Sequence, residues 1–368
     1  MSSPPAARGA GAILTIDLDA IAANYRTLRD RLDGAACAAV VKADAYGLGV
    51  EAVAPALHKA GCRRFFVALL DEAIVLRRCL PDAEIFVIIG LLPGTAPAFP
   101  EHRLVPVLND LGQIEEWRRG CADSGSLPAA LHIDTGMNRL GLGPEDSARL
   151  IAEPDRLAGI DLRCVMSHLI HAEAADDPLN QTQLARFAAI RHRLPAAPGS
   201  LANSSGVFLG PAFHLDLARP GAALYGVNPI PGAPNPMRNV VRLTARIVQL
   251  RDVDSPMTVG YGATHKVVNK GKIATISIGY ADGYLRSTSG RGSCLVGGVR
   301  VPMVGRVSMD LITVDVSNVP SQNLEPGGFA EILGDDFGVD DLARESGTIG
   351  YEILTALGRR HHRRYVGA

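Results

Sequence analysis

Cysteine is sparse in this sequence, and its spacing fits neither a metal site nor a disulfide framework. None of the six cysteines among 368 residues belongs to a CxxC pair, and several lie in apolar runs. Zinc sites and small disulfide scaffolds need close, paired cysteines, so we interpret these as reduced thiols of the core and expect no metal site. They are Cys37, Cys62, Cys79, Cys121, Cys164 and Cys294.

Long apolar runs and blocks of like charge are also missing. No window approaches the roughly 20 apolar residues that span a bilayer. Lysine and arginine (37) nearly balance aspartate and glutamate (38), for a formal net charge of -1. This composition argues against nucleic-acid and membrane partners and favours a small-molecule ligand. Residues 1–11 lack the charged start and apolar core of a signal peptide, so we expect a loose tail on a cytoplasmic protein.

Strand-like apolar runs alternate with helical patterns over about 220 residues, in a chain that is 47% hydrophobic. The expected strands cover 38–42, 64–68, 85–89, 104–108, 129–134, 162–167, 200–203 and 214–218. The expected helices cover 17–32, 50–60, 71–80, 110–122, 145–153 and 180–194. Eight strands with intervening helices predict the α/β class and a (β/α)₈ TIM-type barrel. An open doubly wound sheet stays possible, because periodicity does not show closure.

The pattern changes after the proline-rich segment 228–236. Short β-type runs separated by glycine and aspartate turns follow it. We therefore expect a barrel over 12–232 and a mostly β domain over 236–368. The expected strands of this domain cover 241–250, 272–278, 293–296, 300–304, 311–316 and 329–333, and its expected helices cover 340–345 and 351–357.

One lysine ends a β-branched apolar run and precedes a glycine-flanked turn, in the stretch VVKADAYGLG of residues 40–49. An amine at the carboxyl end of a buried strand is desolvated, which lowers its pKa, as Schiff-base chemistry requires. The alternative is a strand-end lysine whose ammonium reaches solvent. Lys42 is therefore the first candidate for a catalytic residue.

The other expected barrel strands also end in polar residues, and barrel active sites lie at the carboxyl ends of the strands. Taken alone, each residue has a structural explanation, such as a surface ion pair, a core histidine, a helix cap or a rim charge. Convergence at one rim indicates a site. These residues are Arg139, His168, Asn203, Ser204 and Arg219.

An anion site is expected beside the last two strands. Ser204, Gly221 and the backbone around Ala222 form a plausible cradle at the position where barrels often hold phosphate.

Several strings resemble motifs of the pyridoxal-phosphate-dependent alanine racemases, in family order, from Thr15 to about Tyr351. The segment AVVKADAYGLG is similar to the motif that carries the cofactor lysine. The others are GMNRLG, NS, RPGAALYG, VGYGAT, IGYADG, GRVSMD and GYE. The resemblance implies a homodimer with shared active sites that binds pyridoxal phosphate, interconverts L-alanine and D-alanine, and supplies D-alanine for peptidoglycan.

The resemblance also assigns catalytic and substrate-binding roles. Lys42 would carry the cofactor and act as one base, and Tyr261 of the partner chain would act on the opposite face. A tyrosine with its usual pKa of about 10 is a poor base at neutral pH, so nearby cations must help, and His168 and Arg219 are the candidates. Substrate binding would fall to Arg139, Met309 and Asp310, the last two from the partner.

For the cofactor, the resemblance implies a set of phosphate contacts and one unusual ring contact. Arg219 would face the pyridine nitrogen, and because a guanidinium accepts no proton, transamination would be restrained. Asn203 would lie nearby. The phosphate would be held by Tyr46, Ser204, Gly221, Ala222 and Tyr351.

At one position the chain departs from the family. Seven residues before Arg139 the family often has a lysine modified to a carbamate, which orients that arginine, whereas this chain has His132. An imidazole does not reproduce a carbamate anion. We expect either a bound anion or water to orient Arg139, or His132 simply to fill a barrel layer.

Other functions fit parts of the pattern. A racemase of another small amino acid, such as serine, stays open. A decarboxylase on the same scaffold would pair the pyridine nitrogen with a carboxylate, and Arg219 argues against it. A barrel that only binds cofactor would not need a second domain with Tyr261 and Met309. An aldolase with a Schiff-base lysine would not need the phosphate cradle.

Overall fold

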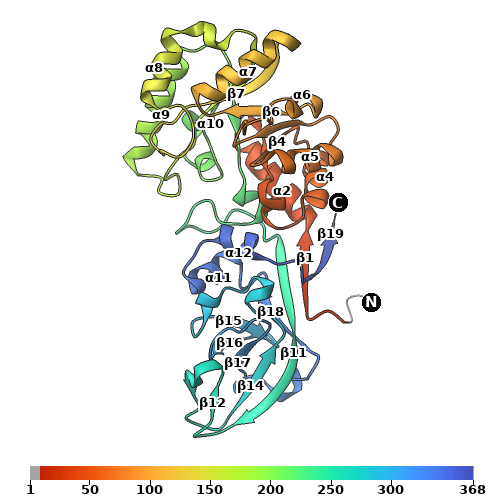
Figure 1. The fold of residues 1–368 in the computed structure, drawn as a ribbon. Helices are drawn as coiled ribbons and strands as arrows, with labels where there is room; N and C mark the ends of the chain where they lie inside the picture. The colour runs from red at the N-terminus through yellow and green to blue at the C-terminus, as the bar shows by residue number, and fades with distance from the viewer. Residues whose placement is uncertain (1–8, 368) are drawn as a thin grey trace.

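The computed structural model describes residues 9–367, except for the side chains of residues 122–124. Figure 1 shows two lobes, an α/β lobe above and a β-rich lobe below. Most of the expected N-terminal tail lies outside the described residues. Among the described residues, no helix is long and apolar enough to cross a membrane.

The strands of the first lobe form a closed parallel barrel. Seven pair in the order β3-β4-β5-β6-β7-β8-β9, and β10 pairs in parallel with β2, the segment just before β3. Backbone hydrogen bonds from Asp216 to Gly199 and from Arg219 to Ala202 join β10 to the β9 region, so the ring closes. The expected TIM-type barrel is confirmed and the open sheet is excluded. The strands are β2 (Ala36–Cys37), β3 (Ala39–Val40), β4 (Arg64–Val67), β5 (Glu84–Val87), β6 (Val105–Leu108), β7 (Leu127–His132), β8 (Ile160–Met166), β9 (Gly199–Ser200) and β10 (Leu217–Ala218).

Six helices of this lobe lie where the apolar spacing predicted them, and two short ones, α6 and α10, were not expected. The first begins after Asp17, whose Oδ1 accepts a hydrogen bond from the Ala20 N–H at 2.8 Å. Ile21, Tyr25 and Leu28 form its buried face. The helices are α2 (Leu18–Asp30), α4 (Val50–Lys59), α5 (Leu70–Cys79), α6 (Ala98–Glu101), α7 (Leu111–Ser124), α8 (Pro144–Ala152), α9 (Pro178–Arg191) and α10 (Pro211–His214).

The second lobe is built on a mostly antiparallel sheet in the order β14-β17-β16-β15-β18-β11-β1-β19. A further pairing of β14 with β11 closes its first six strands into a small barrel. Its strands and helices lie within a few residues of those that we expected after residue 236. They are β11 (Val241–Val253), β14 (Gly271–Ile276), β15 (Ser293–Val296), β16 (Val299–Val304), β17 (Ile312–Asp315), β18 (Phe329–Leu333), α11 (Val339–Ser346) and α12 (Gly350–Ala356).

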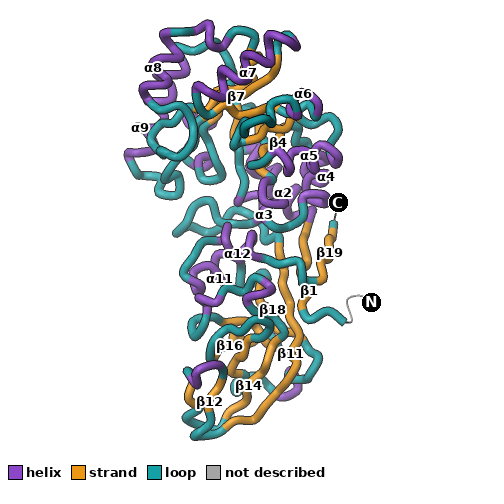
Figure 2. Tube along the Cα trace, in the orientation of Figure 1, coloured by secondary structure: helices purple, strands orange, loops and turns teal. Residues whose placement is uncertain are grey.

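Two strands that we did not expect join the ends of the chain to this sheet. Strand β1 (Ala12–Asp17) pairs antiparallel with β11 and parallel with β19 (His362–Val366). Figure 2 shows the three strands side by side where the lobes meet. We expected the barrel domain to begin at residue 12, but residues 12–17 hydrogen-bond within the second lobe's sheet.

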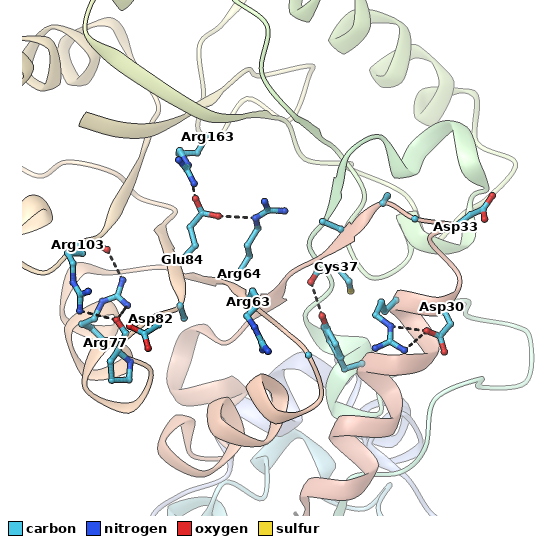
Figure 3. A pocket seen from close by; sticks show the side chains of 18 residues that line it. Asp30, Asp33, Cys37, Arg63, Arg64, Arg77, Asp82, Glu84, Arg103 and Arg163 are labelled. Carbon is cyan, nitrogen blue, oxygen red and sulfur yellow. Dashed lines mark hydrogen bonds and ion pairs between the residues drawn. The ribbon is translucent and has the colours of Figure 1, made fainter. Parts of the chain in front are cut away.

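Ion pairs bind the amino end of the first barrel together. Glu84 of β5 accepts hydrogen bonds from Arg64 of β4 at 2.9 Å and from Arg163 of β8 at 2.8 Å (Figure 3). Because β5 and β8 are not neighbours in the sheet, this carboxylate spans the barrel end. A cavity of about 1110 Å³ lies here. Arg77, which lines it, donates hydrogen bonds to backbone carbonyls of the surrounding loops, including that of Pro81. We interpret this end as structural.

Candidate active site

The site residues expected on the barrel line one cavity of about 580 Å³ at the carboxyl ends of the strands. The cavity at the amino end is larger but contains none of them. We assign the site to the smaller cavity because it combines an amine, an anion cradle and a buried guanidinium. The expected residues in it are Lys42, Tyr46, Arg139, His168, Asn203, Ser204, Arg219, Gly221, Ala222 and Tyr351.

Lys42 begins the short helix α3 (Lys42–Tyr46) directly after the first barrel strand. Burial lowers the pKa of its amine, and the positive charge of Arg139 lowers it further, while Glu72 opposes the shift. A lowered pKa makes more neutral amine available at physiological pH. This is the condition for a nucleophilic lysine.

Ser204 and Gly221, where we expect an anion cradle, lie together between the last two strands. The Ser204 hydroxyl oxygen accepts hydrogen bonds from the N–H groups of Gly221 at 3.0 Å and Ala223 at 3.2 Å, which leaves its O–H to donate into the cavity. A Cβ on Gly221 would lie 2.4 Å from the Tyr46 hydroxyl. Only glycine fits here. The Tyr46 ring is held by packing against Tyr225, with ring centroids 4.8 Å apart.

Arg219 is buried, with 5% of its surface exposed, and donates to Ser200 Oγ and, at 2.6 Å, to the Ser167 carbonyl. Burial lowers its pKa only to about 10, so it stays charged. Burial and the charge of Arg219 lower the pKa of His168 to about 3. Our expectation that His168 adds a second cation is therefore not supported by its surroundings, which favour the neutral imidazole.

His132, at which the chain departs from the family pattern, has one side-chain hydrogen-bond partner. His132 is buried on β7, and its Nδ1 lies 2.8 Å from Asn109 Oδ1. Burial, followed by the charge of Arg219, lowers its pKa to about 4, so the ring is neutral. Among the described residues, Arg139 makes no hydrogen bond or ion pair, and it lines the same cavity as His132.

Three of the four residues expected from the second domain, Tyr261, Met309 and Asp310, do not line this cavity in their own chain. Tyr261 is 72% exposed and borders a separate cavity of the β lobe. Met309 is 53% exposed, and Asp310 pairs with Arg360 at 2.8 Å. Tyr351 does reach the barrel cavity, because α12 packs beside α3.

Sequence reasoning missed two polar side chains that hydrogen-bond to residues lining this cavity. Asn109 directly follows the fourth barrel strand, so the strand-end rule that found Arg139 could have found it. Glu72 accepts a hydrogen bond from the Ala43 N–H, next to Lys42, at 2.7 Å. Its only local signal is that of a helix-capping glutamate.

Two family models cover almost the whole chain. The alanine racemase N-terminal domain matches residues 16–229, and the alanine racemase C-terminal domain matches residues 240–365. The chain belongs to the alanine racemase family. The alanine racemase of Rhodospirillum rubrum is 52% identical over 361 residues, which cover 97% of this chain and 96% of that protein. The catabolic alanine racemase of Mesorhizobium japonicum is 49% identical over 99% of this chain and 96% of its own length.

Alanine racemases of known structure share the two-lobed architecture. The crystal structure of the Bartonella henselae alanine racemase, which has covalently bound pyridoxal phosphate, superposes with a TM-score of 0.94 at 40% identity. The match covers 97% of this chain and 100% of that one. The family likeness therefore extends over both lobes.

Proposed function

We propose that this chain is a pyridoxal-phosphate-dependent alanine racemase that interconverts L-alanine and D-alanine. One observation carries the proposal: Lys42, the cradle at Ser204 and Gly221, and Arg219 all face one cavity in a chain of this family. Reaction in the L-to-D direction would supply D-alanine for peptidoglycan synthesis. We propose that the protein itself is cytoplasmic.

The residues present fit the cofactor. The Ser204 hydroxyl and the backbone at Gly221 suit a phosphate, since a side chain at residue 221 would collide with Tyr46. Tyr46, Asn203, Ala222 and Tyr351 complete the walls around that phosphate. When bound, pyridoxal phosphate supplies the electron-withdrawing ring that stabilises negative charge at the substrate α-carbon.

The protein's own groups then place protons and charges. The neutral amine of Lys42 would hold the cofactor and exchange a proton with one face of the α-carbon. Arg139 would lie toward the cofactor's phenolic oxygen and bind the substrate carboxylate through its guanidinium. Arg219 would leave the pyridine nitrogen unprotonated, because a guanidinium donates hydrogen bonds and accepts none.

We propose a homodimer in which Tyr261, Met309 and Asp310 of the partner complete each site. Racemisation needs a second proton-transfer group on the opposite face, and Tyr261 is exposed on a different lobe from Lys42. A small amino acid such as serine is the alternative substrate, because the cavity's described contacts do not by themselves select a methyl side chain.

The test combines absorbance with optical inversion. Purified protein should bind pyridoxal phosphate in a yellow covalent form that borohydride fixes on Lys42, and it should convert L-alanine to D-alanine. Lys42→Ala should lose the covalent form and nearly all activity. A panel of L-amino acids ranks substrates, and release of carbon dioxide instead of inversion would point to a decarboxylase. Retained covalent absorbance in Lys42→Ala would refute the assignment of the lysine.

A further inference from the structure

The turn that follows Lys42 has an unusual backbone. Ala43, Asp44, Ala45 and Tyr46 have φ values of 54°, 55°, 54° and 55°, in the left-handed region. A run of non-glycine residues in this conformation is intrinsically unfavourable for L-amino acids. Contacts from outside the turn must therefore stabilise it.

Several side chains supply these contacts. Arg363 donates to the Gly47 carbonyl at 2.7 Å and Tyr365 to the Leu48 carbonyl at 2.9 Å, both from β19. A third contact comes from within the turn, where Asp44 accepts from the Val50 N–H at 2.7 Å. These three contacts hold the exit of the turn, several residues beyond Lys42.

Glu72 alone among these side chains holds the entrance, next to Lys42. Its Oε1 accepts from the Ala43 N–H at 2.7 Å. Its Oε2 accepts from the N–H of Ala68 at 2.8 Å and of Leu69 at 3.2 Å. One carboxylate thus joins the peptide after Lys42 to the end of β4 and the start of α5.

Glu72 also contributes charge at the lysine. The charged or titratable groups that act on Lys42 are Arg139, His168 and Glu72. The guanidinium disfavours the ammonium form of Lys42, and the Glu72 carboxylate favours it. Glu72 therefore affects both the position and the protonation of this amine.

We propose that Glu72 is a positioning residue for the active-site lysine, fixing the peptide between Lys42 and Ala43 and placing a carboxylate near the amine. This inference rests on the proposed function for its consequence in catalysis. A simple helix cap is the competing explanation, because Glu72 is also the third residue of α5 and accepts from the N–H of Leu69, the N-cap residue.

A matched control separates the two explanations. Asp341 is the third residue of α11 and accepts from the Gly338 N–H at 2.9 Å, but it does not line the Lys42 cavity. Asp341→Ala removes a comparable cap without affecting the lysine. Glu72→Gln keeps the side-chain length and removes the charge, so it replaces Glu72→Ala as the test variant if Glu72→Ala does not fold.

The first measurement uses the protein without cofactor. The pH dependence of Lys42 modification by an amine reagent, followed by peptide mass spectrometry, reports the pKa of this amine. Loss of the Glu72 charge should move the midpoint to lower pH in both Glu72 variants and leave it unchanged in Asp341→Ala. A second measurement titrates pyridoxal phosphate, and Glu72→Ala should weaken its covalent attachment by about tenfold.

The outcomes are distinct. If both Glu72 variants behave like Asp341→Ala, with lowered stability but an unchanged midpoint and unchanged attachment, Glu72 is only a cap and the proposal is wrong. If wild-type protein attaches no pyridoxal phosphate, the proposed function fails, while the midpoint measurement still decides whether Glu72 acts on Lys42.

Discussion

His132 Nδ1 lies 2.8 Å from Asn109 Oδ1, and the surroundings of Asn109 determine which atom carries the proton. The two N–H groups of the Asn109 amide nitrogen have only acceptors around them, the carbonyls of Ile88, Ile89 and Val107, at 3.0, 3.1 and 2.9 Å from the nitrogen. Its oxygen must therefore accept, so His132 carries hydrogen on Nδ1 and presents Nε2 as an acceptor. This neutral acceptor belongs to the cavity that Arg139 also lines.

We predict that this acceptor helps to orient Arg139. His132→Leu removes Nε2 while keeping an apolar side chain in the barrel. Arg139 and His132 line the same cavity without a direct hydrogen bond, so a bound water would link Nε2 to the guanidinium. Loss of this water-mediated contact should raise the KM for L-alanine about tenfold and leave cofactor absorbance unchanged. An unchanged KM would mean that His132 only fills the barrel layer.

The same histidine should make stability depend on pH. Its pKa is about 4 in the folded protein and about 6.5 unfolded, so the unfolded chain binds more protons between these values. Its contribution is present above pH 6.5 and is lost as pH falls towards 4, by about 3 kcal/mol. The free energy of unfolding, measured with urea at several pH values in this range, should rise less steeply with pH in His132→Leu than in the wild type.

Arg219→Glu should increase transamination, a side reaction, relative to racemisation. A carboxylate facing the pyridine nitrogen favours its protonation and so a more electron-deficient ring. Transamination measured as pyruvate should therefore rise relative to racemisation. A fall in racemisation with no rise in pyruvate would contradict the role assigned to Arg219.

Shared sites can be tested by complementation. Lys42→Ala and Tyr261→Phe should each be inactive, but a mixed dimer places both defects in one site and leaves the other whole. With random exchange, half the dimers are mixed and half their sites are intact, so about a quarter of wild-type activity should return. Background activity, when mixed tags demonstrate exchange, would rule out the shared site.

The ion pairs at the amino end should contribute to stability and not to catalysis. Glu84→Gln leaves Arg64 and Arg163 without their shared carboxylate. We expect a loss of about 1 kcal/mol in urea unfolding, reduced at high salt, with unchanged racemisation. Asp30→Asn, at an exposed pair with Arg29, is the control and should have almost no effect.

Much of the fold follows from local patterns in the sequence. Apolar periodicity predicted the eight barrel strands and the six longer helices around them, because each strand must bury its side chains and each helix one face. Polar residues just past the strands then marked Lys42, His168, Ser204 and Arg219, since parallel strands bring their carboxyl ends to one rim. These inferences need only short stretches of chain.

Only the tertiary structure shows the features that depend on residues far away in the sequence. Residues 362–366 carry three basic side chains and form a strand because they pair with 12–17, about 350 residues away. Local pattern identifies Glu72 only as a helix cap and Asn109 only as a polar residue after a strand. Pairing of β3 with β4 brings the first to the peptide after Lys42, and pairing of β6 with β7 brings the second to His132. Hydrogen bonds act over ångströms in space, whatever the separation along the chain.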